Sequence, residues 1–255
     1  MLNAYLENRL AEKEILVMTH IVLGYPSFEA SFKVIETMVT AGVDLMELQI
    51  PFSEPTADGP VIARANQIAL EDGITVEASL EFAGMAARKF DIPFLIMTYY
   101  NVPFKYGLSR FVADLAGGGL QGAIIPDIPP EEGSAYLAAM KQHNLAPVLI
   151  YSPTTSAERM RYIDSFAAGF IYCVARKGVT GQETKFSEDL SAYLDQCRQS
   201  TRLPLALGFG IKEKADIDFL KGKVDIAVIG TQTIRIMEEK GIEAIGEFIG
   251  GLRSG

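Results

Sequence analysis

Short apolar runs recur along the chain and alternate with longer segments in which apolar and polar residues are mixed. The runs are rich in β-branched residues and are bounded by Gly, Pro or polar turns, a pattern typical of β-strands. They predict eight strands, near Leu16–Leu23, Val43–Ile50, Pro93–Thr98, Gly122–Pro126, Ala146–Tyr151, Gly169–Val174, Leu205–Gly208 and Asp225–Gly230.

The segments between these strands have the period of amphipathic helices. One apolar stripe is formed by Phe28, Phe32, Ile35 and Met38–Val39, and another by Met160, Ile163 and Phe166. Helix N-caps are expected at Ser27, Thr75 and Ser187, and a helix C-terminus at Gly42. Leu2, Leu6 and Leu10 predict a short N-terminal helix that would plug the bottom of a barrel.

Eight alternating strand–helix units in 255 residues predict a (β/α)8 TIM barrel, an α/β fold. A doubly wound open sheet is the second choice, because the Gly-rich dinucleotide turn that usually follows its first strand is absent. The sequence there is Leu23-Gly24-Tyr25-Pro26. No Pro/Ser-rich linker or block of charge divides the sequence, so residues 1–255 are expected to form a single domain.

Composition narrows the range of partners and locations. Hydrophobic residues make up 49% and charged residues 22%, which is ordinary for a globular protein, and the net charge of −9 argues against nucleic acid or an anionic membrane as main partner. Cys173 and Cys197 form no disulfide framework or metal motif. No signal peptide or membrane-spanning run is found, so a cytoplasmic protein is expected.

The most informative segment for chemistry runs from Val43 to Pro60. Because strand side chains alternate, Glu47 shares its face with Val43, Leu45 and Gln49. A carboxylate on such a face is costly to bury unless it is paired or chemically useful. Asp58 follows in the next loop, and in a barrel both carboxylates would point to the mouth that holds the active site. A buried, hydrogen-bonded Glu and a helix-capping Asp are the structural alternative.

Glycine-rich turns follow three successive predicted strands, which suggests a phosphate site. These turns are Lys177-Gly178-Val179-Thr180-Gly181, Leu207-Gly208-Phe209-Gly210-Ile211 and Ile229-Gly230-Thr231. Glycines let backbone N–H groups approach an anion, and the helix predicted from Thr231 to Glu238 offers its positive N-terminus. In TIM barrels the loops after strands 7 and 8 are the usual phosphate cradle.

Other kinds of chemistry have weaker support. His20 and His143 are the only histidines and lack metal-type neighbours, so a metal-dependent epimerase is disfavoured. His20 is interpreted as a hydrogen-bonded core residue. Lys177 leaves open an aldolase that forms a Schiff base, although a solvated loop lysine keeps an ordinary pKa.

Taken together, the motifs resemble the tryptophan synthase α subunit family in order and spacing, through nearly the whole chain. The resemblance implies retro-aldol cleavage of indole-3-glycerol phosphate to indole and glyceraldehyde 3-phosphate. It is carried by Glu47 with Pro51-Phe52-Ser53, Ala57-Asp58-Gly59-Pro60, Pro126-Asp127-Ile128-Pro129, Gly178-Val179-Thr180-Gly181, Gly208-Phe209-Gly210-Ile211 and Gly230-Thr231.

The same resemblance implies roles for individual residues. Glu47 would shuttle protons as the acid–base, and Asp58 would hold the indole nitrogen. Thr180 would close over the site, Tyr99 and Tyr172 would line its indole end, and Gly181, Gly210, Gly230 and Thr231 would bind the phosphate. No metal or cofactor is implied on this chain. The implied partner is a β subunit that carries pyridoxal phosphate in an αββα complex.

Several positions depart from the family pattern. Gln49 stands where a glycine is usual, and its amide would either crowd the substrate or hydrogen-bond the Glu47 carboxylate. Glu54 replaces the usual aspartate beside Pro55, in the loop implied to contact the β subunit. These departures leave open a weakly catalytic, ligand-binding subunit that mainly activates its β partner.

Overall fold

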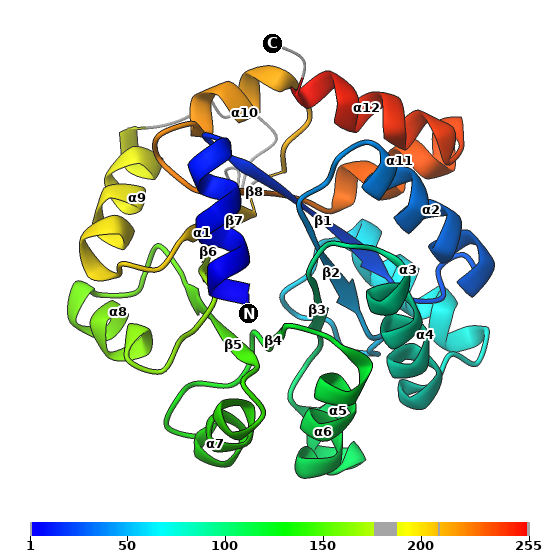
Figure 1. Cartoon of the computed structure of the whole chain (residues 1–255), viewed down its shortest axis with the longest axis horizontal. Helices are drawn as coiled ribbons and strands as arrows, with labels where there is room; N and C mark the ends of the chain where they lie inside the picture. Colours follow the sequence, from blue (N-terminus) through cyan, green and yellow to red (C-terminus); the bar gives the residue numbers. More distant parts are fainter. Residues whose placement is uncertain (1, 176–187, 209, 254–255) are drawn as a thin grey trace.

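The computed structural model describes residues 2–175, 188–208 and 210–253, and these form the (β/α)8 barrel that the sequence predicts (Figure 1). Parallel strands pair in sequence order, and β1 closes the barrel against β8. The strands are β1 Leu16–Val22, β2 Leu45–Gln49, β3 Phe94–Met97, β4 Gly122–Ile124, β5 Ala146–Tyr151, β6 Ile171–Val174, β7 Leu205–Gly208 and β8 Ile226–Ile229.

Helices surround the barrel and connect its strands (Figure 1). They are α1 Leu2–Glu12, α2 Phe28–Thr40, α3 Pro60–Glu71, α4 Val76–Lys89, α5 Asn101–Tyr106, α6 Leu108–Gly118, α7 Ser134–Gln142, α8 Ala157–Asp164, α9 Glu188–Ser200, α10 Lys214–Leu220, α11 Thr231–Lys240 and α12 Glu243–Arg253.

Helix α1 closes one end of the barrel, as the leucine spacing predicts (Figure 1). Leu2 and Leu6 are buried in the cluster of residues that fills the barrel interior, and Leu10 packs against that cluster. Tyr5 donates a hydrogen bond to the carbonyl of Asp44, just before β2. Because this contact lies before a strand begins, α1 covers the N-terminal end of the barrel and leaves the C-terminal mouth free.

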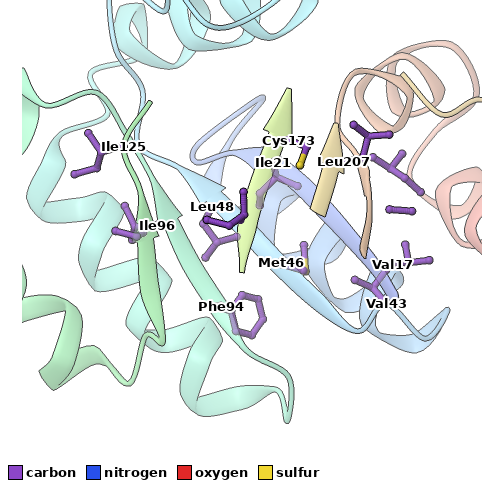
Figure 2. Close-up of a cluster of buried hydrophobic side chains, with 14 of the residues drawn as sticks. Val17, Ile21, Val43, Met46, Leu48, Phe94, Ile96, Ile125, Cys173 and Leu207 are labelled. Atoms are coloured by element: carbon purple, nitrogen blue, oxygen red, sulfur yellow. The ribbon is translucent and has the colours of Figure 1, made fainter. Parts of the chain in front are cut away.

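Side chains alternate between two apolar layers along each strand. Met46 and Leu48 of β2 point outward into the layer between strands and helices, together with Val17 and Ile21 of β1 (Figure 2). Leu45 points inward with the interior cluster. The alternation therefore directs Glu47 and Gln49 into the barrel, as strand parity predicts.

The expected helix ends are largely confirmed. Ser27 and Thr75 cap α2 and α4 by accepting hydrogen bonds from backbone N–H groups, and Gly42 has the positive φ of a residue that ends a helix. Ser187 lies outside the described residues. The second apolar stripe is partly wrong: Met160 and Ile163 are buried, but Phe166 lies beyond the end of α8 and is 37% exposed.

Within the described ranges, no helix is long and apolar enough to cross a membrane. Cys173 and Cys197 are buried, free thiols.

Candidate active site

Glu47 lies inside the barrel toward the C-terminal end of β2 and is 4% exposed. Parallel pairing of β1 with β2 places His20 opposite Glu47, and both side chains face inward. His20 Nδ1 is 3.0 Å from Glu47 Oε1. The phenol of Tyr172, on β6 across the barrel, donates a longer hydrogen bond of 3.4 Å to the same oxygen. The carboxylate is therefore held through Oε1.

The second oxygen of Glu47 is not held in this way. Oε2 is buried and has no hydrogen-bond partner among the described residues. A buried carboxylate oxygen without a partner is costly for a purely structural residue. The arrangement leaves Oε2 available to a bound molecule, which favours the functional interpretation of Glu47.

The pKa values of His20 and Tyr172, which both contact Glu47, are raised. Burial disfavours the charged form of His20, but its hydrogen bond to Glu47 and the nearby negative charge outweigh burial, so the pKa of His20 is raised. Burial and the Glu47 charge raise the pKa of Tyr172 well above its usual value. Tyr172 therefore stays protonated and acts as a donor.

Asp58 lies in the loop after β2, on the same side of the barrel, and is held by two donors. Gln49 donates its amide to Asp58 Oδ2 at 2.8 Å, and the Tyr99 phenol donates to the same oxygen at 2.9 Å. Tyr99 also accepts the backbone N–H of Ala57 at 3.0 Å. Burial and the Asp58 charge raise the pKa of Tyr99, which keeps this phenol a donor.

Gln49 does not make the hydrogen bond to the Glu47 carboxylate that was one of the two roles expected for it. The amide binds Asp58 and not the Glu47 carboxylate, although the Gln49 side chain shares the inward face with Glu47. Gln49 is completely buried, and its carbonyl Oε1 has no hydrogen-bond partner among the described residues. The amide therefore reaches along the strand face toward the mouth.

The loop that carries Asp58 is anchored at its start. Phe52 stacks on the Tyr99 ring at a centroid distance of 5.1 Å, and its backbone N–H binds the Asn66 side chain in α3 at 2.9 Å. Glu54 is exposed and Pro55 is half-buried, so the two residues expected to contact a partner stand on the rim. The contacts of Phe52 fix the base of the loop while its rim stays accessible.

Of the three predicted phosphate-binding turns, the one after β8 is described in full and the one after β7 apart from Phe209. Gly210 follows β7 with a positive φ of +73°, and Gly230 is the N-cap of α11, whose first residue is Thr231. The first N–H groups of a helix lack intrahelical acceptors, so this end of α11 suits an anion. A Cβ added to Gly230 would lie 3.4 Å from His20 Cβ, so the N-terminus of α11 adjoins the residue that contacts Glu47.

Three candidate residues cannot be placed by these observations. Lys177, Thr180 and Gly181 lie outside the described residues. In the part of the chain that is described, no group of three or more His, Cys, Asp or Glu side chains could hold a metal ion.

His20 belongs to the site, in contact with Glu47. The sequence identified it as a hydrogen-bonded residue of the core, and that is confirmed. Its partner is Glu47, however, so it belongs to the site. The alternation of side chains along the first strand indicates that His20 faces into the barrel. Alternation alone does not fix the register between β1 and β2, which pairs His20 with Glu47.

Comparisons with known proteins agree with this geometry. The sequence model of the family described as tryptophan synthase alpha chain matches residues 6–247. The chain is 62% identical over 252 residues to the tryptophan synthase alpha chain of Desulforapulum autotrophicum, covering 99% of this chain and 100% of the relative. That of Syntrophotalea carbinolica is 59% identical over 253 residues, with coverage of 99% and 100%.

A solved structure extends the similarity to the whole fold. The crystal structure of tryptophan synthase subunit alpha from Legionella pneumophila superposes with a TM-score of 0.89 at 29% identity, covering 99% of this chain and 96% of that chain. This chain therefore belongs to the tryptophan synthase alpha chain family.

Proposed function

We propose that this chain cleaves indole-3-glycerol phosphate with Glu47 as the acid–base and Asp58 as the group that holds the indole nitrogen. The chain is a carbon–carbon lyase of tryptophan biosynthesis, the activity of its family. One observation carries the assignment of the two residues. Both carboxylates lie at the C-terminal mouth of the barrel, each with one oxygen held and the other without a hydrogen bond to any described side chain.

The reaction needs two proton transfers on one face of the substrate. Indole C3 must gain a proton, and the hydroxyl on the adjacent side-chain carbon must lose one. The electrons of that O–H bond then form the aldehyde carbonyl, while those of the broken C–C bond return to the indole ring. Glu47 can perform both transfers through Oε2, and Asp58 can accept the indole N–H. Protons balance, because the one taken from the hydroxyl replaces the one delivered to C3.

The phosphate group would lie at the cradle formed by Gly210, Gly230 and Thr231. With a net charge of −9 the protein has no general attraction for an anion, so recognition would depend on local N–H groups. Thr180 and Gly181 are proposed to complete this side of the site, from the family resemblance alone. Gly230 lies next to His20, which contacts Glu47. One small molecule could therefore have its phosphate at Gly230 and its reacting carbon at Glu47.

Membership of the family implies a β-subunit partner. We assign the exposed rim at Glu54 and Pro55 to that contact, in an αββα complex whose β subunit carries pyridoxal phosphate and takes up the indole. The rim residues lie in the loop that carries Asp58, so contact with a partner would act directly on the catalytic loop. The chain itself is proposed to use neither metal nor organic cofactor.

A weakly catalytic subunit that mainly activates its partner is the second candidate. The observations that suggest it are Gln49 and Glu54, which depart from the family pattern. The amide of Gln49 binds Asp58 and leaves Oε2 of Glu47 without a hydrogen bond to a described residue, which favours a catalytic site over a blocked one.

Release of indole from indole-3-glycerol phosphate tests the proposal, with the purified chain alone and with a β subunit. Glu47→Gln should lower the rate by roughly a hundredfold to ten-thousandfold, because the amide cannot transfer protons. Phosphate binding and thermal stability should be retained. Glu36→Gln, the same change at an exposed position of α2, is the matched control. No indole from the wild type under either condition contradicts lyase activity, and full activity of Glu47→Gln contradicts the assigned acid–base.

A further inference from the structure

Both carboxylates at the barrel mouth are held in the same way. Glu47 is bound through Oε1 by a nitrogen of His20 and by the phenol of Tyr172. Asp58 is bound through Oδ2 by the nitrogen of Gln49 and by the phenol of Tyr99. Each carboxylate thus has one nitrogen donor and one phenol donor on a single oxygen. The phenols belong to residues that the resemblance places at the indole end, whereas the nitrogen donors have no role in it.

The contact between His20 and Glu47 is set by the backbone. The two residues are directly paired in the register of β1 with β2, and their side chains are 4% and 5% exposed. The 3.0 Å contact of His20 is shorter than the 3.4 Å contact of Tyr172, so the imidazole is the stronger of the two donors. Without His20, the buried carboxylate would depend on a long hydrogen bond from one phenol.

Gln49 is oriented by its contact with Asp58. Its Nε2 faces the carboxylate at 2.8 Å, whereas the opposite assignment of the amide would bring carbonyl and carboxylate oxygens together. The carbonyl Oε1 is consequently turned away from Asp58. Oε1 of Gln49 and Nε2 of His20 are both buried and lack partners among the described residues, and the Gln49 side chain favours the protonated form of His20.

From these contacts we propose that His20 and Gln49 are positioning residues, each of which fixes one carboxylate so that its free oxygen faces the substrate. His20 holds Oε1 of Glu47 and leaves Oε2 for the two proton transfers. Gln49 holds Oδ2 of Asp58 and leaves Oδ1 for the indole N–H. A glycine at position 49 could make neither the contact with Asp58 nor the approach to His20.

This inference rests on the proposed function, and it predicts defects in turnover more than in binding. A carboxylate that samples several rotamers reaches the reactive geometry less often, whereas the phosphate is held elsewhere, at Gly230 and Thr231. Variants that remove a donor should therefore lower kcat and leave KM nearly unchanged. A purely structural role would lower the melting temperature without this selective effect on kcat.

The experiment compares matched variants in the indole-release assay. Gln49→Met keeps the length of the side chain without its donor, and His20→Phe keeps a ring of similar size without nitrogen. Each should lower kcat on the order of tenfold or more, since small misplacements of catalytic groups cost that much. His20→Asn, which retains an N–H near the position of Nδ1, should recover most of the lost rate. Thermal melting of each variant gives the structural control.

The pH profile separates positioning from packing. The groups that face His20 from the described elements are Glu47 on β2, Asp58 in the following loop and Tyr172 on β6. The pKa of His20 is raised, so its charged form persists to higher pH than in a free histidine. The wild-type kcat should fall as pH rises through that pKa, and His20→Asn should lack this alkaline limb because an amide does not titrate.

The outcomes also separate this inference from the proposed function. Wild-type kcat in both Gln49→Met and His20→Phe would contradict the positioning role while leaving the lyase assignment intact. A loss of activity that follows the melting temperature, without rescue by His20→Asn, would contradict it as well. Absence of indole from the wild type would instead contradict the proposed function itself.

Discussion

Tyr99 makes both of its hydrogen bonds in the site through its phenol oxygen. Its phenol oxygen donates to Asp58 and accepts from Ala57, while its ring stacks on Phe52. Tyr99→Phe would retain the stacking and remove both hydrogen bonds. The expected result is a fall in kcat of about tenfold and a loss of about 1–3 kcal/mol in unfolding free energy. Steady-state kinetics and urea denaturation would measure the two effects. Unchanged kinetics with lowered stability would show that Tyr99 supports the loop alone.

Gly208 controls the position of another phenol. A Cβ added at this residue would lie 3.0 Å from the Tyr172 hydroxyl, so Gly208→Ala must displace the phenol that binds Glu47. We expect kcat to fall severalfold while the fold is retained, because the atoms nearest to the added Cβ belong to the phenol of Tyr172, which has to shift by a few tenths of an ångström. Gly251→Ala in α12, where an added Cβ meets nothing within 4 Å, is the control. Equal activity of the two variants would contradict a role for Tyr172 at Glu47.

Helix α11, whose N-terminus is the proposed anion site, is anchored at its far end. Glu238 of α11 binds Arg64 of α3 at 2.5 Å and accepts a hydrogen bond from Tyr25, in the loop after β1. Burial and the Glu238 contact raise the pKa of Tyr25 to about 12, so Tyr25 remains a donor at neutral pH. Burial favours protonation of Glu238, but its bonds to Tyr25 and Arg64 outweigh that effect and lower its pKa. The anchor therefore depends on an ionised Glu238.

Tyr25→Phe should lower the unfolding free energy by about 1–2 kcal/mol at pH 7. Because the folded-state pKa of Glu238 is lowered, its contribution is present above the unfolded pKa of about 4.3 and is lost as pH falls through the lower folded value. The difference between wild type and Tyr25→Phe should therefore shrink below pH 4. Denaturation at pH 7 and pH 3.5 would measure it, and an equal difference at both values would contradict this account.

Elements were more predictable from the sequence than contacts between them. The strands could be recognised because each is an apolar run that ends at Gly, Pro or a polar turn. The second apolar stripe shows where local pattern fails, since Phe166 continues the helical spacing after α8 has ended at Asp164. Helix ends depend on backbone contacts, such as the hydrogen bond of Phe166 N–H to the Ile163 carbonyl three residues earlier, which the spacing of apolar residues does not encode.

The site was predictable to the extent that it follows strand parity. Parity and order placed Glu47 and Asp58 at one mouth. The partners of Gln49 and His20 could not be predicted, because side-chain orientation and the register between β1 and β2 decide them. One of the two roles expected for Gln49 was a hydrogen bond to Glu47, two residues away on the same face. The loop instead brings Asp58 back over the strand end, where the amide meets it.

The two ends of the barrel have different roles: one is closed by a packed helix, and the other carries the candidate active site. Helix α1 closes the N-terminal end, with Leu6 completely buried in the interior cluster. The two carboxylates and the proposed anion site lie at the opposite mouth. The rim of that mouth includes the exposed Glu54 and the half-buried Pro55, in the loop between β2 and α3 that carries Asp58. A partner seated on this rim would act on the carboxylate through a few residues of backbone, without passing through the core.

This geometry predicts that a change at the rim alters indole release by the complex with a β subunit and not by the isolated chain. Glu54 is exposed, and neither of the two side-chain hydrogen bonds to the Asp58 carboxylate involves it. Glu54→Arg should therefore leave indole release by the chain alone unchanged. It should weaken the stimulation of that release by a β subunit, because the charge at the expected contact is reversed.

Titration with a β subunit, followed by indole release, would measure the apparent affinity and the maximal stimulation separately. Glu54→Asp, which restores the usual residue of the family, is the conservative comparison and should retain tight binding. A charge reversal at Glu36 on α2 controls for net charge. If Glu54→Arg lowers indole release by the isolated chain as much as by the complex, the Glu54 side chain acts on the catalytic loop without a partner. If it alters neither, the β subunit must be seated elsewhere, because a reversed charge within a contact cannot leave its affinity unchanged.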